Sequence, residues 1–356
     1  MRGHDRVGTD PLTPRHLNRA LLDRQMLLER SEGPLTAVIE QMGGIQMQYA
    51  PAGYIGLWSR MRDLKRRMLT AALEERRAIQ ATMMRVTIHT VSAADYWPMM
   101  AGIRRTTREW QARVRAREMS GVDMETIACV VREELADGPL RITELTARLE
   151  SRGLPARAVS WVGPWVDLVR VPPSGTWDRR RADLYLLADA WLPRVEVSEE
   201  DGIQLLIRRY LGAFGPARLA DIATWMGLKV GTIRPVAERM ELSRYRDERG
   251  RPLVDLADAT LPDPATPAPV RFIAVWDAML LVHARRTEVL PEALRPLIFN
   301  TRTPHSVNTI LVDGQVAGTW RHEMDRIQVT PLRTLTADER REVNDEAQRL
   351  AAFHAG

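Results

Sequence analysis

Two stretches of the chain repeat one pattern, and this repeat constrains the fold more than any other feature. One stretch begins at Gly138 (GPLRITELTARLESRG) and the other at Gly215 (GPARLADIATWMGLKV). Each opens with Gly-Pro, one further residue and an arginine (Arg141 or Arg218), and an apolar, a small, an acidic and an apolar residue follow. A proline in the first turn with an acid close behind is typical of a helix start. Each stretch therefore predicts a helix directly after its arginine.

The repeat continues beyond this first helix in both stretches. A short turn and a second amphipathic helix are expected over residues 156–168 and 230–240, and an extended apolar run and a Pro/Gly-rich turn follow in each. An upstream helix precedes each copy, METIACVVREELAD in one and EDGIQLLIRRYLGAF in the other. Helix-turn-helix followed by a small hairpin is the winged-helix pattern. Two copies argue against a chance match.

A third copy is expected near the N-terminus. The helical pattern LNRALLDRQMLLER precedes LTAVIEQM, further helix follows, and RVTIHTVSA alternates like a strand. The predicted fold is therefore mainly α with small β elements (α+β), with three tandem winged-helix units. The expected units are residues 1–120, 121–196 and 197–262, and a C-terminal β-rich region with a terminal helix spans 263–356.

The C-terminal region carries its own local signals. A Pro-rich stretch over 259–272 predicts a linker, and SVNTILVDGQVAGTW predicts a hairpin whose Asp-Gly pair suits a type I′ turn. In the tail, Thr336 and Glu339 have the spacing of a capping box at the start of a helix.

Charge and cysteine content narrow the class of protein. The chain has 51 Lys plus Arg against 46 Asp plus Glu, and of these cations only Lys65 and Lys229 are lysines. Arginine binds phosphate oxygens through two parallel hydrogen bonds, which suits a nucleic-acid surface; a GC-rich coding sequence is an equally good explanation. The single Cys129 excludes an internal disulfide and a cysteine-based zinc cluster. Without an apolar run of membrane length or a signal peptide, we expect a cytoplasmic protein, associated with the nucleoid when bound to DNA.

The segment GGIQMQYAP places Gln46 and Gln48 one residue apart. Residues two apart point in different directions on a helix but to the same side of an extended segment. Gly43-Gly44 is expected to end a helix and Pro51 to discourage another, so an extended segment is predicted. A glutamine amide is no useful base near neutral pH, yet its carbonyl can hold and orient a water. Two loop glutamines bonded to backbone or solvent are the plain alternative.

Six ordered stretches resemble the AlkZ-like family of bacterial DNA glycosylases, three-winged-helix proteins. The resemblance implies that the three units form a concave DNA-binding scaffold. They cover nearly the whole chain and are LNRALLDRQMLLER, GGIQMQYAPAGYIGLWSR, MRVTIHTVSAADY, YLGAFGPARLADIATWMGL, AVWDAMLLVHARRTEVL and TILVDGQVAGTWR. The family's catalytic element, a Gln, a hydrophobic residue and then Gln or Asp, matches Gln46, Met47 and Gln48. The chain departs from the family pattern at residues 275–278 (VWDA, with Trp276), where relatives more often carry PEFD, and at Ala284, where an Asp is expected.

The resemblance implies an activity and a partner. The expected function is a monofunctional glycosylase that hydrolyses the N-glycosidic bond of cationic N7-alkylated purines, including bulky adducts and interstrand crosslinks. A purine alkylated at N7 already carries a positive charge and leaves without being protonated, so a positioned water is the main requirement. The expected partner is double-stranded DNA with alkylated purines, bound by a monomer without metal or cofactor. No lysine falls in the motif, so no lyase step is expected.

Further residues are expected to contact DNA. Arg85, Thr87 and His89 alternate along the predicted strand and would share one face, although a His among apolar neighbours is more often structural. The full set of expected DNA contacts is Arg60, Arg85, Thr87, His89, His283, Arg286, Asp313, Gly314 and Arg321. For the Asp313-Gly314 turn the alternative is an internal sheet element, and for the basic run that begins at Arg60 it is a solvated helix face.

Two other functions compete with the enzyme. One is a winged-helix transcription regulator or DNA-structure binder without catalysis, and the other is a glycosylase-derived protein that has kept DNA binding and lost activity. Loss of base release on substitution of Gln46 or Gln48 would exclude the first.

Overall fold

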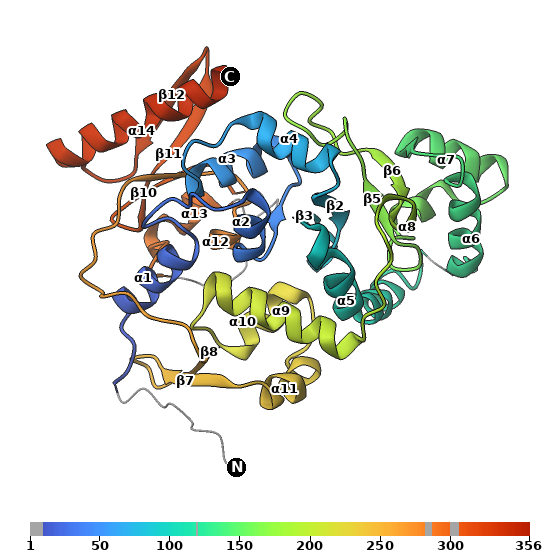
Figure 1. Ribbon diagram of the computed structural model, residues 1–356, viewed down its shortest axis with the longest axis horizontal. Helices are drawn as coiled ribbons and strands as arrows, with labels where there is room; N and C mark the ends of the chain where they lie inside the picture. The colour runs from blue at the N-terminus through green and yellow to red at the C-terminus, as the bar shows by residue number, and fades with distance from the viewer. Residues whose placement is uncertain (1–9, 119, 282–286, 300–305) are drawn as a thin grey trace.

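The computed structural model describes residues 10–118, 120–281, 287–299 and 306–356, and it has a mixed α+β fold with small antiparallel sheets (Figure 1). The helices are α1 (Pro14–Arg24), α2 (Leu35–Gln41), α3 (Ala50–Arg60), α4 (Arg66–Glu74), α5 (Ala93–Val114), α6 (Met124–Glu134), α7 (Ile142–Ser151), α8 (Ala188–Trp191), α9 (Glu199–Phe214), α10 (Leu219–Met226), α11 (Val230–Arg239), α12 (Ala278–Leu281), α13 (Arg295–Ile298) and α14 (Ala337–Ala355), with 3-10 turns η1 (Met84–Val86), η2 (Ala156–Ser160) and η3 (Glu292–Leu294). The strands are β1 (Ile45–Gln46), β2 (Ala78–Thr82), β3 (Ile88–Ser92), β4 (Leu140–Arg141), β5 (Leu168–Arg170), β6 (Leu184–Leu187), β7 (Leu242–Arg246), β8 (Pro252–Leu256), β9 (Arg271–Ile273), β10 (Thr309–Val312), β11 (Gln315–Glu323) and β12 (Arg326–Pro331).

One order of elements recurs three times along the chain. A helix leads into a short extended segment, further helices follow, and a hairpin closes the group: α2–β1–α3 to β2–β3, α6–β4–α7 to β5–β6, and α9 to β7–β8. In each group the short segment pairs with the second hairpin strand, as β1 with β3, β4 with β6, and Ala217 with Val254 of β8. We call these the first, second and third groups. Their assignment as winged-helix units, and the predicted unit boundaries, stay predictions.

The hairpins of the first and second groups join into one sheet. Its strand order is β1-β3-β2-β5-β6-β4, and the junction is the antiparallel pair of β2 and β5, in register at Gln80 with Arg170 and Ala81 with Val169. In Figure 1 this junction lies between the blue first group and the green second group, and the third group lies below them. The sheet therefore fixes the second group rigidly beside the first.

Two glycines allow α5, which follows the first group, to pack closely against α9 of the third group. Helix α5 packs along α9, and at their contact a side chain on Gly202 would place its Cβ 2.5 Å from the backbone nitrogen of Gly102. Because neither position has room for a side chain, the backbones approach each other directly. Around this contact lies the largest apolar core, which includes Met99, Ile203 and Leu206.

The C-terminal region forms a separate four-stranded sheet in the order β12-β11-β10-β9. Asp313 and Gly314 both have positive φ (47° and 78°), as the predicted type I′ turn requires. The capping box of Thr336 and Glu339 starts α14, as predicted, and α14 packs on β12 at one corner of the molecule (Figure 1). Within the described residues, no helix combines the length and apolar character that a membrane crossing requires.

Three local expectations were wrong. In place of the helix expected over 156–168 the structure has only the short 3-10 turn η2, because Gly163 and Pro164 interrupt the helical pattern. Pro51 lies in the first turn of α3 and helps to start this helix. The strand expected from Arg85 begins at Ile88, because Arg85 adopts a left-handed backbone (φ 55°) in η1.

Candidate active site

The segment with the two glutamines is extended at Gln46, as predicted, and bends at Gln48. Gln46 pairs with His89 at the end of β1, and the backbone N–H of Met47 donates to Ile88 O at 2.7 Å, which carries the extended backbone one residue further. Gly43 and Gly44 precede it with φ of 70° and 83°, a conformation that ends α2 at little steric cost because neither has a Cβ. Gln48 follows in the bend that leads into α3, so Gln46 is buried on β1 and Gln48 is exposed just beyond it.

The side chain of Met47, between the two glutamines, anchors the segment in the core. Its side chain is buried and its sulfur lies 2.8 Å from Thr90 Oγ1, while a Cβ on Gly53 would lie 2.5 Å from Met47 Cγ. An apolar residue between the two glutamines thus packs into the core, and Gly53 of α3 provides the space for it.

Gln46 is buried and its amide is oriented by Arg85. The guanidinium Nη2 of Arg85 donates to Gln46 Oε1 at 3.1 Å, and Nη1 donates to the carbonyl oxygen of Trp225 in α10. Burial lowers the pKa of Arg85 to about 10, so it stays a cation at neutral pH. Arg85 therefore ties Gln46 of the first group to the third group.

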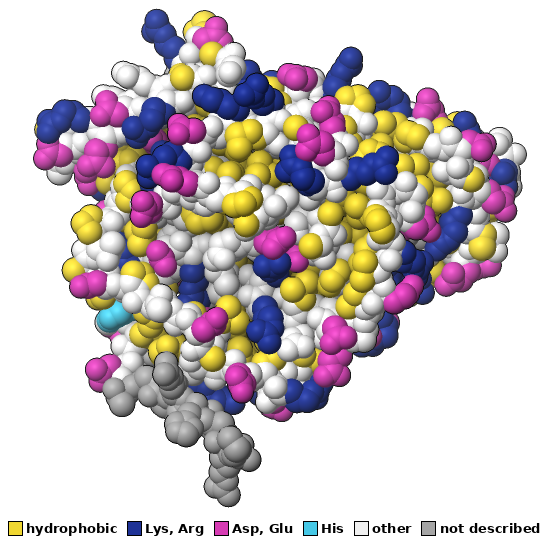
Figure 2. Space-filling view, in the orientation of Figure 1, with side chains coloured by type: hydrophobic (Ala, Val, Ile, Leu, Met, Phe, Trp, Pro, Cys, Tyr) yellow, Lys and Arg dark blue, Asp and Glu magenta, His cyan; other side chains and the backbone are white. Residues whose placement is uncertain are grey.

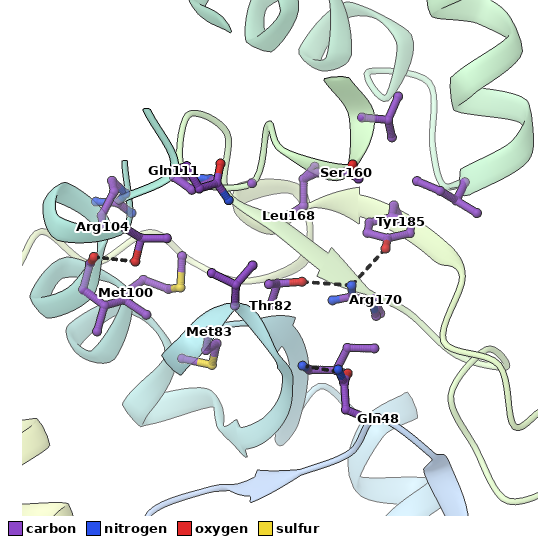
Figure 3. A pocket seen from close by; sticks show the side chains of 18 residues that line it. Gln48, Thr82, Met83, Met100, Arg104, Gln111, Ser160, Leu168, Arg170 and Tyr185 are labelled. Carbon is purple, nitrogen blue, oxygen red and sulfur yellow. Dashed lines mark hydrogen bonds between the residues drawn. The ribbon is translucent and has the colours of Figure 1, made fainter. Parts of the chain in front are cut away.

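Gln48 is exposed and lies at the edge of a cavity. Its Oε1 accepts a hydrogen bond from the backbone N–H of Ile88 at 3.1 Å, so the 85–88 segment contacts both glutamines. Figure 3 shows Gln48 at one edge of the cavity, on the side where Arg170 lies, and Gln111 and Arg104 toward the opposite edge. The cavity has a volume of about 330 Å³, and none of its described lining residues is an Asp or Glu.

His89 and Thr87 turn inward. His89 Nδ1 donates to the carbonyl oxygen of Thr87 at 3.0 Å, and burial together with the positive charge of Arg85 lowers the His89 pKa to about 3. The ring is therefore neutral at physiological pH, and since it is 2% exposed it is not placed to contact DNA. The expected DNA contact through His89 is wrong for this reason, and the structural alternative fits. Thr87 Oγ1 donates to Met84 O at 3.0 Å, and a DNA contact there stays a prediction.

Arg60 is also buried, which contradicts its expected contact with phosphate. Its guanidinium forms two hydrogen bonds to the carboxylate of Asp277, at 2.8 and 3.0 Å, and it also donates to Gln25 Oε1 at 2.9 Å. With no exposed surface, Arg60 links α3 to the segment before α12. The solvated face proposed as the alternative is wrong for this residue as well.

The remaining expected DNA contacts lie away from the glutamines or outside the described residues. Gly314 is buried against α1, where a Cβ would lie 2.6 Å from Asn18 Oδ1, and Asp313 pairs with Arg15 at 2.6 Å and with Arg19. The hairpin tip docks on α1 with Gly314 buried and Asp313 half-exposed, and a DNA contact there stays a prediction. Arg321 is exposed on β11 and pairs with Glu323 at 2.9 Å, so its role stays a prediction. His283 and Arg286 lie outside the described residues.

The surface charge gives no further guide to the site. Figure 2 shows Lys and Arg side chains interspersed with Asp and Glu on the face it displays, without a single basic patch. In the described ranges, no cluster of three or more His, Cys, Asp or Glu side chains could hold a metal ion.

The sequence analysis missed two polar residues of the cavity, Arg170 and Gln111. Arg170 follows four apolar or acidic residues of the run VDLVRV and ends β5. Gln111 lies in a helix whose exposed face is rich in arginine. The arginine within an otherwise largely apolar strand was the signal available for the first. Gln111 gave none, because its burial depends on the packing of the second group against α5.

Comparison with known proteins gives the family to which this fold and this site belong. A solved structure of Streptomyces sahachiroi DNA glycosylase AlkZ is similar in fold, with a TM-score of 0.79 over 97% of each chain at 19% sequence identity. A family model described as DNA glycosylase AlkZ-like matches residues 39–353. No curated protein matches.

The chain belongs to the AlkZ-like DNA glycosylase family. It is a DNA glycosylase, and DNA is its partner. The matched residues begin before Gln46 and end within α14, so the family assignment includes the glutamine segment and the cavity beside it.

Proposed function

We propose that this protein is a monofunctional glycosylase for cationic N7-alkylated purines in duplex DNA, including bulky adducts and interstrand crosslinks, and that Gln46 and Gln48 position the attacking water. The observation that carries the proposal is the pair itself, since the carbonyl of each amide is anchored by a donor from residues 85–88. The protein would act as a monomer in the cytoplasm, in DNA repair or in protection against a genotoxic product.

The reaction needs little help from acid or base. The bond between C1′ and the purine nitrogen breaks, and its electron pair moves onto the base and neutralises the positive charge created by alkylation. Water then bonds to C1′ and loses one proton to solvent, which leaves an abasic sugar and a neutral N7-alkylpurine. A fixed water lowers the barrier because it removes the cost of orienting the nucleophile.

The anchored amides are suited to that limited role. Each glutamine carbonyl has two lone pairs, and one is already used by Arg85 or by the Ile88 N–H, which fixes the amide plane. The second lone pair can accept a hydrogen bond from water and so direct its oxygen. Arg85 acts as a positioning residue for Gln46.

The surroundings match a substrate that is already charged. His89, the nearest titratable imidazole on β3, is neutral, and the described cavity lining has no carboxylate. A base whose departure needs protonation would find no acid among these groups. We therefore expect unmodified purines to be left intact.

The test is single-turnover base release from duplex DNA with one N7-methylguanine, measured for wild type, Gln46→Ala and Gln48→Ala. Gln204→Ala in α9 is the matched control, since it removes the same side chain from a helix outside the site. We expect each site variant to lose ~100-fold or more, the scale of a lost reactant position, and the control to match wild type.

Release by both site variants at the wild-type rate would refute the role of the glutamines. Absence of release by wild type, with DNA binding intact, would leave the non-catalytic DNA-binding protein as the function.

A further inference from the structure

The cavity beside Gln48 lies where three parts of the chain meet. Residues of β2, η1 and β3 form one side, α5 forms a second, and the second group forms the third. Most of its wall is apolar, through side chains that include Met83, Val86, Ile88, Met100, Ile103, Val159 and Leu168. Its volume of about 330 Å³ is at the lower end of the range for small-ligand sites.

Arg170 brings a positive charge to this wall, and no Asp or Glu among the described residues pairs with it. The residue is 8% exposed, Nε donates to Ala182 O at 3.0 Å, and Nη2 donates to Thr82 Oγ1 and to the Tyr185 hydroxyl at 2.9 Å each. All three acceptors are neutral, and burial lowers the pKa of Arg170. Within the described residues Nη1 makes no hydrogen bond, so this group can still donate to an oxygen in the cavity.

Gln111 brings an unused acceptor to the same cavity. Its side chain is 2% exposed, and Oε1 is buried without a hydrogen-bond partner among the described residues. A buried polar atom without a partner costs free energy of folding, so a structure that keeps one has a site for a missing partner. Figure 3 shows Gln111 toward the opposite edge of the cavity from Gln48.

We propose that this cavity binds the N7 substituent of the lesion, and that it takes an apolar, planar group that carries an oxygen acceptor for Arg170. The inference rests on the proposed function, because Gln48 at the cavity edge places the damaged nucleotide beside it. The alkylated purine itself stays outside, since its positive charge would be repelled by the guanidinium of Arg170. The neutral substituent fills the apolar space, and its oxygen accepts from Nη1.

The cavity would therefore select lesions by the size of their N7 substituent and favour bulky ones. A methyl group leaves it empty, whereas an aryl group displaces water from its apolar walls. We therefore expect the protein to favour N7-arylalkyl guanines over N7-methylguanine.

The test compares three duplex substrates that differ in the N7 group of one guanine. N7-methylguanine has no ring, N7-benzylguanine has an apolar ring, and N7-phenacylguanine has a ring and a carbonyl oxygen. Single-turnover rates are measured with enzyme below saturation, so that substrate binding contributes, and each is divided by the spontaneous release rate. We expect phenacyl to exceed methyl by about tenfold or more, which corresponds to roughly 1.4 kcal/mol and is less than full burial of an aromatic ring provides.

A matched pair of variants tests the location. Ser160→Trp places a large ring at the cavity wall, and Ser151→Trp is its control, because both serines are exposed and each hydroxyl donates to the backbone carbonyl three residues earlier at 2.7 Å. We expect Ser160→Trp to abolish the preference, so that the ratios of the benzyl and phenacyl rates to the methyl rate fall to about one. The control should keep all three rates.

The variant Arg170→Met tests the hydrogen bond from Arg170 to the oxygen of the substituent. Thermal unfolding establishes that the variant is folded. The ratio of phenacyl to benzyl rates should fall to about one, since both rings still enter the cavity. If that variant does not fold, the serine pair still decides the location.

Equal relative rates for the three substrates with wild type would overturn this inference and leave the proposed function intact. The same conclusion follows if Ser160→Trp keeps the preference. Absence of release from all three substrates, N7-methylguanine included, would instead refute the proposed function.

Discussion

The short strands β1 and β4 occupy the same place in the first and second groups, yet they lead into different structures. Each strand pairs with the second strand of its hairpin, with Gln46 opposite His89 and Arg141 opposite Leu184. After Arg141 the helix α7 begins at once, and its capping box includes a bond from Arg141 N to Glu144 Oε2 at 2.8 Å. After Gln46 the chain continues through residues 47–49 before α3 begins.

The delay of the helix is what creates the glutamine pair. In the second and third groups an arginine stands before the helix and pairs with an acid, Arg141 with Asp183 and Arg218 with Asp221. In the first group that position is Gln46, the extra residues add Gln48, and Met47 anchors them. The second and third groups therefore have an ion pair at the start of the helix, whereas the first group has neutral amides at this place.

Conversion of Gln46 to the arginine of the other groups should have the largest effect. Gln46→Arg places a second guanidinium against Arg85, whose Nη2 now lies 3.1 Å from Gln46 Oε1, and it removes a water acceptor. We expect single-turnover release of N7-methylguanine to fall by ~100-fold or more. Gln46→Asn, which keeps an amide, should fall less; equal losses would show that charge is not the cause.

Substitution of the cross-strand partner should change stability with pH. Folded His89 has a pKa of about 3, whereas an unfolded His has a pKa near 6.5, so between these values the unfolded chain binds more protons. Stability from the neutral ring is present above pH 6.5 and is lost as the pH falls toward 3. In the second group a leucine, Leu184, lies opposite Arg141. The substitution His89→Leu should therefore remove this loss of stability at low pH.

Urea unfolding at pH 7 and pH 4 measures the effect. The fall in unfolding free energy between the two pH values should be smaller in His89→Leu than in wild type by on the order of 2 kcal/mol. Equal falls would show that His89 is not protected from protons in the folded state.

The reverse substitutions, Arg141→Gln and Arg218→Gln, should have small effects. Both guanidinium groups are partly exposed and their ion pairs are at the surface, so each change should lower the unfolding free energy by about 1 kcal/mol or less. Base release should stay within about threefold of wild type. A loss near that of Gln46→Ala would show that these arginines contribute to the reaction.

The smallest effect expected is that of pH on the reaction. Gln46 and Gln48 do not titrate, His89 has a pKa of about 3, and Arg85 has a pKa of about 10. Since the alkylated guanine itself ionises near neutral pH, the enzymatic rate is divided by the spontaneous rate at each pH. This ratio should vary by less than about twofold between pH 5.5 and pH 8. A bell-shaped profile would show a general acid or base.

The sequence predicted what local pattern controls. The repeat, the type I′ turn, the capping box of α14 and the extended backbone at Gln46 all follow from residues close together in the chain. It did not predict the burial of Arg60 or the docking of the Asp313 turn on α1, because their partners lie 217 and 294–298 residues away. An arginine on a helix has the same local pattern whether it faces phosphate or a buried aspartate.

The two-residue junction of β2 and β5 also limits how this protein can be divided. A fragment that ended before β5 would leave β2 as an open strand edge, with backbone donors and acceptors ready to pair with another copy. Such a fragment would tend to aggregate. A shortened version meant for expression or display would therefore have to retain β5 and β6, through residue 187, even if its purpose were to study the glutamine segment alone.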